Sequence, residues 1–452
     1  MAFYRAMDPP ERVAVVGIGY VGLTLLCALG KAGYTGLGYD INEEKVASVA
    51  RGVVPFEGGE RELEALLAEL APAGKITATT DPAQLARVDA VFIAVETPVD
   101  DSDHRPRYHA LRAALQTICP FLPSGVLVVV ESTIAPGTIH GLVLPALEEA
   151  TGGQVGRDFF LVHCPERVMP GRLLKNINSY DRVVGGVTSE CTRRALGIYQ
   201  RVTSGTLHPT DAKTAEIVKT AENAYRDVQI AFANELALMC EELGADVFEV
   251  RELVNSSPFR NMHLPGAGVG GHCIPKDPWL LVSAMSDYTP RLLPTARAIN
   301  DGMPLHLAEL ASRELAAEGR SLTGAIITIL GAAYLEGTDD TRNAPALALA
   351  RHLTGLGVTV RLFDPYVTRL EEYAVSGDDT AIDGSDALIL VTAHEEFRTL
   401  DLAACARRMR TPVLVDGRNC LDLTVARQAG FRVQAIGKGN LSSTDRTVAS
   451  AE

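Results

Sequence analysis

The sequence lacks several features that would point to particular classes of protein. None of its eight cysteines belongs to a C-x-x-C pair, and no spacing suggests a zinc site or a disulfide framework. No run approaches ~18 apolar residues, and the start, MAFYRAMDPPERVAVVGIG, has no charged-then-apolar signal peptide. We therefore expect no metal site, no transmembrane helix and a cytoplasmic location.

Positive charge is also scarce. The chain of 452 residues carries a net charge of −14, and only eight of its 42 basic residues are lysines. A nucleic-acid surface needs clustered Lys and Arg to neutralise phosphates, so no such partner is expected, and any anionic substrate must be held by a few local cations. The length suits two or three domains of ~100–200 residues each.

What is present is an alternation of short apolar runs with helical stretches. Runs at 12–17, 34–40, 89–95, 125–131 and 158–163 are followed by a second set at 324–334, 358–366, 385–394 and 411–419. Such alternation predicts parallel sheets covered on both faces. Between the two sets, residues 210–243 contain no Gly or Pro and show apolar side chains at three- and four-residue spacing, which predicts one amphipathic helix of over 30 residues.

These patterns predict an α/β protein with two Rossmann-like doubly wound domains joined by a long central helix. A helix of this length typically bridges domains or packs against a second copy of the chain. We place the boundaries at 1–205 for the first domain, 206–318 for the central helical region and 319–438 for the second domain. Residues 439–452 are small and polar, and we expect them to be disordered.

A glycine fingerprint follows the first predicted strand. Gly17, Gly19 and Gly22 lie where a strand turns into a helix, and Asp40 ends the next strand. The glycines allow a tight turn, close approach of a pyrophosphate to the helix N-terminus, and close packing of helix on strand. Asp40 can accept hydrogen bonds from ribose hydroxyls and would repel a 2′-phosphate, so NAD is favoured over NADP.

A second glycine-rich stretch, PGAGVGGHCIPKDPW at 265–279, fails the same test. No buried strand precedes it, and the two prolines of HCIPKDP exclude a helix that begins there. We interpret the glycines as a sharply bent loop whose backbone approaches a ligand and presents Cys273. Lys276 and Asp277 lie just beyond the cysteine in a proline-stiffened segment.

This stretch resembles the active-site signature of the nucleotide-sugar 6-dehydrogenases, the UDP-glucose and UDP-N-acetylmannosamine dehydrogenase family. Further similar motifs follow in the expected order across residues 11–420: VGIGYVGL at 16–23, ESTIAPGT at 131–138, CPERVMPG at 164–171, KTAENAYRDVQIAFANE at 219–235, GTDDTRNAPA at 337–346 and DGRN at 416–419. The resemblance implies oxidation of the C6 hydroxymethyl of a nucleotide-activated sugar to a carboxylate, with two NAD+ consumed, in a homodimer whose active sites are shared.

The resemblance also implies roles for individual residues. Cys273 would be the nucleophile that forms a thiohemiacetal and then a thioester. Lys219 and Asn223, four apart on one helix face, would stabilise the oxyanion at C6. Asp277, with Lys219, would activate water. Thr133 and Glu166 would lie near that water and the nicotinamide.

Binding roles follow in the same way. The cofactor would contact the three glycines and Asp40, together with Lys45, Thr97, Thr133, Lys276 and Arg342. The nucleotide sugar would contact Glu166, Arg167, Lys219, Asn223, Gly270, Arg418 and, from the second subunit, Arg260. His272 would have a packing or backbone role.

The chain departs from the family pattern at one binding position. An aromatic-Lys pair usually precedes the GTDD motif, but here the pair is Tyr334-Leu335, so one cation is lost from the side of the substrate. The form CPERVMPG resembles the N-acetylhexosamine branch. Because a few pocket side chains decide specificity, glucose or an N-acetylhexosamine and uridine or thymidine all remain open. Two further interpretations are a two-electron hydroxyacid dehydrogenase and a non-catalytic nucleotide-sugar-binding protein.

Overall fold

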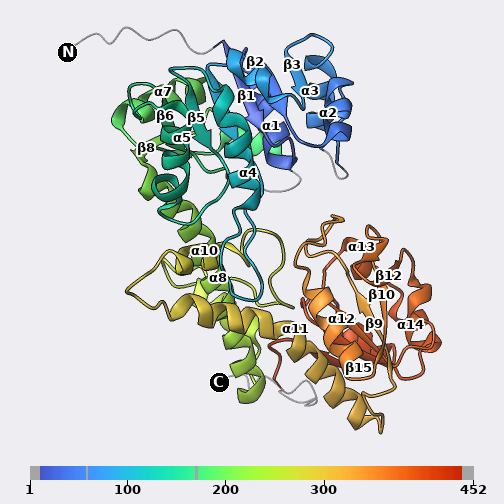
Figure 1. The fold of residues 1–452 in the computed structure, drawn as a ribbon. Helices are drawn as coiled ribbons and strands as arrows, with labels where there is room; N and C mark the ends of the chain where they lie inside the picture. Colours follow the sequence, from blue (N-terminus) through green and yellow to red (C-terminus); the bar gives the residue numbers. More distant parts are fainter. Residues whose placement is uncertain (1–10, 57–59, 168–171, 440–452) are drawn as a thin grey trace. The chain divides into compact units, whose positions relative to one another are not determined.

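The computed structural model describes residues 11–56, 60–167 and 172–439 (Figure 1). The chain forms two compact units. One consists of the chain up to Glu222 together with Trp279–Thr289, and the other of Asn223–Pro278 together with the chain from Pro290 onward. Apart from Gly439, the predicted tail lies outside the described residues.

The first unit contains an eight-stranded sheet with the order β3-β2-β1-β4-β5-β6-β7-β8. Neighbouring strands are parallel except β6 and β7, which run antiparallel with Val162 opposite Gly186. The strands are β1 (Arg12–Val16), β2 (Thr35–Tyr39), β3 (Ile76–Thr79), β4 (Ala90–Ile93), β5 (Leu127–Val130), β6 (Phe160–His163), β7 (Arg182–Gly186) and β8 (Leu207–Asp211).

Helices cover both faces of this sheet. Because successive strand residues point to opposite faces, Val13 and Val15 join one buried cluster while Ala14 and Val16 join another. The helices are α1 (Tyr20–Lys31), α2 (Glu43–Ala50), α3 (Arg61–Leu70), α4 (His109–Ile118), α5 (Leu144–Thr151), α6 (Leu173–Ser179) and α7 (Ser189–Val202), with the short turns η1 (Pro82–Arg87), η2 (Cys119–Phe121) and η3 (Ile139–Val143).

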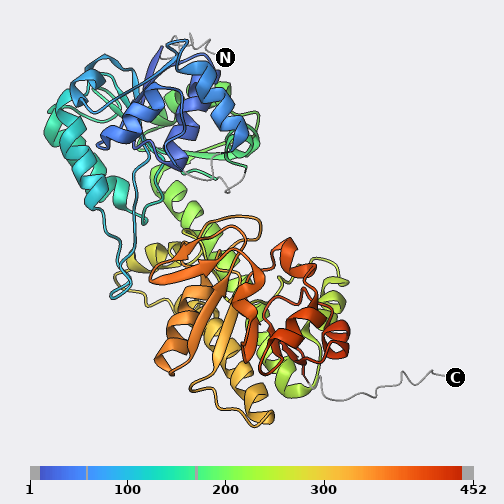
Figure 2. The same ribbon diagram turned by 90° about the vertical axis from the view of Figure 1, so that its right-hand side faces the viewer.

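The second unit contains a seven-stranded sheet with the order β11-β12-β10-β9-β13-β14-β15 (orange to red in Figure 2). Its strands are β9 (Ile326–Leu330), β10 (Thr359–Phe363), β11 (Arg369–Leu370), β12 (Tyr373–Ser376), β13 (Ala387–Leu390), β14 (Val413–Asp416) and β15 (Arg432–Ala435). Two buried clusters again divide the alternate residues of its strands. The helices are α9 (Val247–Asn255), α11 (Leu292–Ala317), α12 (Pro345–Gly355), α13 (Glu395–Arg398), α14 (Leu402–Arg408) and α15 (Leu423–Gln428), with η4 (Asp379–Ile382). The prediction of two doubly wound sheets is confirmed.

The predicted long helix is also confirmed: α8 (Ala212–Leu243) runs unbroken for 32 residues. Ala233 and Ala237 are buried on one side of it. Five large apolar side chains of the same helix are exposed, namely those of Ile217, Tyr225, Phe232, Met239 and Leu243. Among the described residues, no helix is both long and apolar enough to cross a bilayer. The cytoplasmic location stays a prediction.

Candidate active site

The first glycine fingerprint forms the turn from β1 into α1. A Cβ at Gly22 would lie 1.8 Å from the carbonyl oxygen of Gly17, so only glycine fits there. A Cβ at Gly19, by contrast, would meet nothing within 4 Å. Gly19 is the N-cap residue of α1, and no side chain caps this end of the helix. Exposed helical amides with open space before them suit the pyrophosphate of a dinucleotide.

Asp40 lies directly after β2, where the fingerprint predicts an acid. Its Oδ2 accepts a hydrogen bond from the amide of Ile18 at 3.0 Å, and its Oδ1 accepts one from the amide of Asn42, also at 3.0 Å. The carboxylate therefore ties the glycine turn to the end of β2 and keeps further lone pairs for ribose hydroxyls. Lys45, half-buried on α2, follows three residues after Asn42. These residues fit NAD.

The segment that follows β5 is held from three sides. Thr97 Oγ1 donates to the carbonyl oxygen of Thr133 at 2.6 Å, and the hydroxyl of Tyr108 accepts from the amide of Ala135 at 2.8 Å. Glu216 on α8 accepts from the amides of Gly137 and Ile139 at 2.6 and 2.7 Å. Burial raises the pKa of Glu216 to about 7. The structure thus brings the two predicted threonines together.

Lys219 and Glu166 form a buried pair in the first unit. Lys219 Nζ lies 3.8 Å from Glu166 Oε1, and both side chains are almost fully buried. Beneath this pair, His163 ends β6 and bonds through Nδ1 to the carbonyl oxygen of Val130 at 2.9 Å. Burial lowers the pKa of His163 to about 3, so its ring is neutral at neutral pH.

Arg167 has a partner that the motif did not predict. Its Nε donates to Glu222 at 3.2 Å, and its Nη1 donates to the carbonyl oxygen of Asp181 at 3.1 Å. Glu222 follows Lys219 by three positions on α8. That spacing places both on neighbouring turns of one face, and it is the only sequence signal that could have indicated the contact.

In the second unit the structure brings Asn223, Lys276 and Asp277 together. Asn223 Nδ2 donates to Asp277 Oδ2 at 2.5 Å, and Lys276 Nζ lies 2.9 Å from Asp277 Oδ1. Asp277 is fully buried. A buried carboxylate is thereby flanked by a neutral donor on one oxygen and a cation on the other.

The expectation that no helix begins in this segment is wrong. Helix α10 (Asp277–Ser283) begins at Asp277, with Pro278 in its first turn. Proline is tolerated there because its missing N–H would have no intrahelical partner. The helix starts after the cysteine, so the glycines still do not lead into it.

The glycine loop before Cys273 packs against a second segment of the same unit. A Cβ at Gly270 would lie 2.4 Å from Tyr334 Cβ, and Gly271 has a φ of +87°. The amide of Gly271 donates to the carbonyl oxygen of Arg342 at 2.8 Å, and Asn343 Nδ2 donates to that of Gly271 at 3.0 Å. The loop is therefore bent as predicted, and the group that approaches Gly270 in the structure is Tyr334.

Cys273 itself is half-buried at the end of this loop. Its carbonyl oxygen accepts from the amide of Asp277 at 2.9 Å, which fixes the turn between the thiol and the acid. Burial, followed by the charge of Lys276, lowers the pKa of His272 to about 4, so this ring is neutral at neutral pH.

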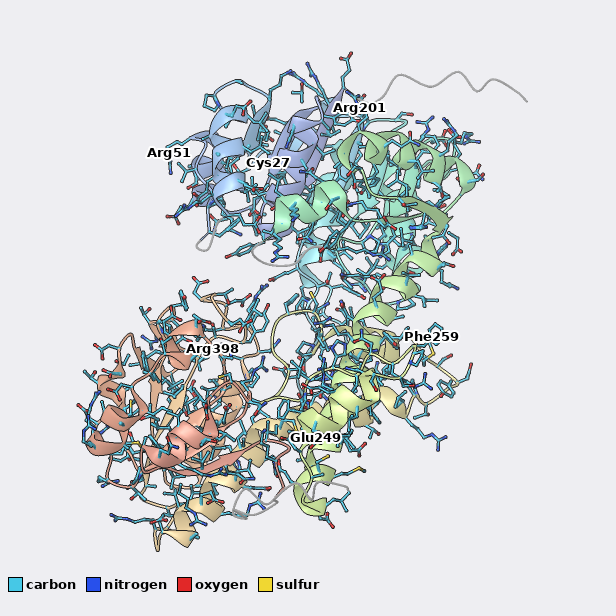
Figure 3. The ribbon with its side chains drawn as sticks, turned by 180° about the vertical axis from the view of Figure 1, so that it is seen from behind. Cys27, Arg51, Arg201, Glu249, Phe259 and Arg398 are labelled. Carbon is cyan, nitrogen blue, oxygen red and sulfur yellow. The ribbon has the colours of Figure 1, made fainter. Side chains whose placement is uncertain are left out.

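The other three predicted arginines lie in different surroundings. Arg418 follows β14, and Gly266 leaves room for it, because a Cβ at Gly266 would lie 2.7 Å from Arg418 Nη1. Arg342 donates from Nε to Asp340 at 2.9 Å, and this bond raises the pKa of the arginine. Arg260 is exposed in the loop after α9, next to the fully exposed Phe259 (Figure 3).

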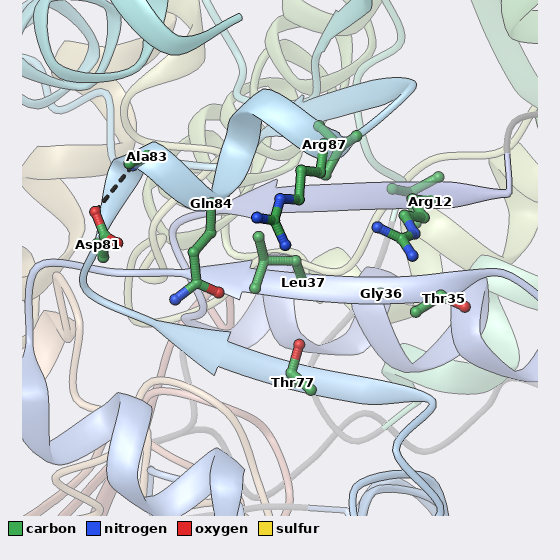
Figure 4. Close-up of a pocket in the computed structure, with 11 residues that line it drawn as sticks. Arg12, Thr35, Gly36, Leu37, Thr77, Asp81, Ala83, Gln84 and Arg87 are labelled. Carbon is green, nitrogen blue, oxygen red and sulfur yellow. Dashed lines mark hydrogen bonds between the residues drawn. The ribbon is translucent and has the colours of Figure 1, made fainter. Parts of the chain in front are cut away.

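A separate cavity of about 500 Å³ lies in the first unit (Figure 4). Arg12 and Thr35, which line it, begin β1 and β2, whereas Gly17 and Asp40 follow the opposite ends of these strands. Ligands of doubly wound sheets bind at the carboxyl ends of the strands, so this cavity is distinct from the cofactor site.

Comparisons with known proteins agree with this geometry. Residues 11–203, 213–302 and 328–423 match the NAD binding domain, the central domain and the UDP binding domain of the UDP-glucose/GDP-mannose dehydrogenase family. The chain is 38% identical over 431 residues to UDP-N-acetyl-D-mannosamine dehydrogenase from Pyrococcus horikoshii, with 95% of this chain and 100% of that protein covered.

Two further similarities are of the same kind. The chain is 34% identical over 427 residues to NDP-N-acetyl-D-galactosaminuronic acid dehydrogenase from Ralstonia solanacearum, with 92% of this chain and 97% of that protein covered. The solved structure of the UDP-D-ManNAc dehydrogenase from Pyrococcus horikoshii superposes with a TM-score of 0.88 over 95% of this chain and 100% of that one. The chain therefore belongs to the UDP-glucose/GDP-mannose dehydrogenase family and is an NAD-dependent nucleotide-sugar dehydrogenase.

Proposed function

We propose that the protein oxidises the C6 hydroxymethyl of a nucleotide-diphosphate hexose twice, to the carboxylate. The first oxidation removes two electrons and gives an aldehyde, to which the Cys273 thiolate adds. The second oxidation converts this thiohemiacetal into a thioester, and water hydrolyses the thioester to release the uronate and the thiol. When bound, NAD+ would supply the hydride acceptor for each oxidation. The observation that carries this proposal is the fully buried Asp277, held by Asn223 and Lys276 four residues beyond the cysteine.

The chain's own residues supply the polar chemistry. Lys219 and Asn223 lie one turn apart on α8, so both donors can face the oxyanion that forms at C6. One N–H of the Asn223 amide is used by Asp277, which leaves the other for the substrate. Asp277 with Lys219 would take the proton of the attacking water. Glu166, beside Lys219, and Thr133 would position that water near the nicotinamide.

The binding roles extend this proposal. The fingerprint, with Lys45 and Thr97, would hold the cofactor, and Lys276 and Arg342 would add positive charge near its phosphates. Contacts to the nucleotide sugar would come from Arg167, Gly270 and Arg418. An acidic side chain of the protein forms an ion pair with each of Lys276, Arg342 and Arg167. The positive charge that each would bring to its ligand is therefore partly neutralised.

For the substrate we favour a UDP-linked N-acetylhexosamine. Two relatives that align with more than nine-tenths of this chain are named for N-acetylated sugars. Residues 328–423 also match a UDP binding domain. Leu335, which is 38% exposed, offers no cation at its position, so a neighbouring arginine such as Arg418 would have to serve the diphosphate.

We also propose a homodimer with shared active sites. Phe232 and Leu243 of α8 are 58% and 79% exposed, and such large apolar side chains along one helix suit burial against a second copy. The exposed Arg260 would then reach the sugar site of the partner.

The experiment is an NADH-release screen with UDP- and dTDP-linked glucose, N-acetylglucosamine and N-acetylmannosamine. We expect two NADH per sugar with a UDP-N-acetylhexosamine. One NADH per sugar, with full turnover retained by Cys273→Ser, would instead identify a two-electron dehydrogenase. No NADH with any of the sugars would contradict the proposal.

A further inference from the structure

A buried chain of hydrogen bonds in the second unit leads from an ion pair to the glycine loop. Arg297 Nη1 contacts Asp227 Oδ1 at 2.5 Å, and Asn300 Nδ2 donates to the same oxygen at 2.7 Å. Asn234 Nδ2 then donates to Asn300 Oδ1 at 2.8 Å, and the amide of Gly266 donates to Asn234 Oδ1 at 2.9 Å. All four side chains are at most 2% exposed.

Each side-chain amide in this series of hydrogen bonds has a fixed orientation. Asn300 must point its NH2 group toward Asp227, because a carboxylate can only accept; its carbonyl oxygen then faces Asn234. Asn234 must in turn present its carbonyl oxygen to Gly266. Asp227, which can only accept, and the amide of Gly266, which can only donate, therefore fix the direction of every bond between them. Asn300 Nδ2 also donates to the carbonyl oxygen of Asp227 at 3.0 Å, which adds a second anchor.

The last group in this series of hydrogen bonds, the amide of Gly266, lies beside Arg418, the arginine assigned to the substrate. Gly266 accommodates the Arg418 guanidinium, since a Cβ at Gly266 would lie 2.7 Å from its Nη1. The next residue, Ala267, is 1% exposed and belongs to the core beneath β9. A Cβ placed at Gly417 would lie 3.2 Å from that of Ala267, so loop and strand end fit closely. A shift at Gly266 would displace Arg418 directly.

We propose that Asn234 and Asn300 are positioning residues: they transmit the orientation set by the Arg297–Asp227 pair to Gly266, and so hold the loop that leads to Cys273 against Arg418. This inference rests on the proposed function for its kinetic consequence, but not for its structural one. Neither asparagine touches the substrate in this scheme.

The test uses three variants of the full-length protein. Asn300→Asp places a second acid beside Asp227. Asp227→Asn removes one of the two acids that pair with the buried Arg297 guanidinium and leaves Asp301 as the other. Each should raise the KM for the nucleotide sugar roughly tenfold or more while the KM for NAD+ changes little, because a broken buried bond shifts the loop and not the glycine fingerprint. In the double variant D227N/N300D the acid and the amide exchange places, and Asn234 still donates to the side chain at position 300. This variant should recover most of the lost affinity.

A second measurement does not depend on turnover. Hydrogen exchange of residues 265–273 in the ligand-free protein should be faster in both single variants and near wild type in the double variant. Ser385→Ala is the control: it removes a buried bond to Thr328 in the same unit, far from the loop in sequence, and should lower thermal stability without changing the sugar KM. Unchanged exchange, or a double variant no better than the single ones, would overturn the inference. If wild type oxidised no nucleotide sugar but exchange responded as expected, the proposed function would fail and the positioning role would stand.

Discussion

The side-chain amide of Asn223 donates a hydrogen bond to the carboxylate of Asp277 across 2.5 Å, although the residues are 54 positions apart. Asn223 belongs to α8, and Asp277 is the first residue of α10. With Lys276 on the other oxygen, the carboxylate is held in one orientation. This contact connects the residue assigned to the oxyanion with the one assigned to water.

Replacing Cys273 should abolish the second oxidation. In Cys273→Ala no thioester can form, so we expect uronate formation to fall by at least about a thousandfold, since no other residue is assigned as the nucleophile. NADH release and product analysis by mass spectrometry would measure this. Cys420→Ser is a matched control, because Cys420 is also half-buried in the second unit and has no assigned role. Full uronate formation by Cys273→Ala would refute the covalent step.

Replacing Asp277 should separate catalysis from stability. Asp277→Asn should lower kcat by about 10²–10⁴-fold if the carboxylate acts as general base. It also leaves the buried Lys276 ammonium without an acid, which should lower the free energy of unfolding by about 3–5 kcal/mol. In the double variant Lys276→Met, Asp277→Asn, urea unfolding should show stability regained, while the NADH assay should show activity still lost. Recovery of activity together with stability would mean that Asp277 has a structural role only.

Glu216 should make stability depend on pH. Burial raises its pKa in the folded protein to about 7, from an ordinary value of 4.5. Between these two values the unfolded chain releases the proton while the folded chain keeps it. The contribution of Glu216 to the free energy of unfolding is therefore fully present below about pH 4.5 and is lost as pH rises through about 7, by an amount on the order of 3 kcal/mol.

Urea unfolding of wild type and Glu216→Gln at pH 5 and pH 8 measures this difference. Glutamine cannot ionise, and it still offers one oxygen to the amides of Gly137 and Ile139. The variant should therefore lose less stability than wild type between the two pH values. Equal losses in the two proteins would show that Glu216 does not titrate in this range.

Shared active sites can be tested by complementation. If Arg260 serves the partner's site, Arg260→Ala and Cys273→Ala should each be inactive. Co-expressed, they should give heterodimers with one intact site, and so roughly a quarter of wild-type activity in a random mixture of dimers. Light scattering of Phe232→Glu, which places a charge on the exposed face of α8, should show monomers. Absence of activity in the mixture, with dimers present, would argue for independent sites.

Several features of the protein could be predicted because their causes are local. Gly17 and Gly22 are spaced by the turn itself, since any side chain at Gly22 would collide with the backbone of Gly17. The 32-residue α8 follows from a stretch without Gly or Pro. Two strands of the first sheet had no such local signal: β7 (RVVGG) ends in two glycines, and β8 (LHPTD) is short, partly exposed and contains a proline.

Other features depend on which distant segments meet, and only the tertiary structure decides them. Glu222 forms an ion pair with Arg167, and Tyr334 packs against Gly270. Helix α10 begins at Asp277, although Pro278 follows it. The sequence by itself determined the first glycine turn and the long helix, because steric limits and helix propensities within a few residues settle them. The tertiary structure decided the partners of the charged and amide groups, because a buried carboxylate or amide bonds to whichever donor the packing of remote elements brings within about 3 Å.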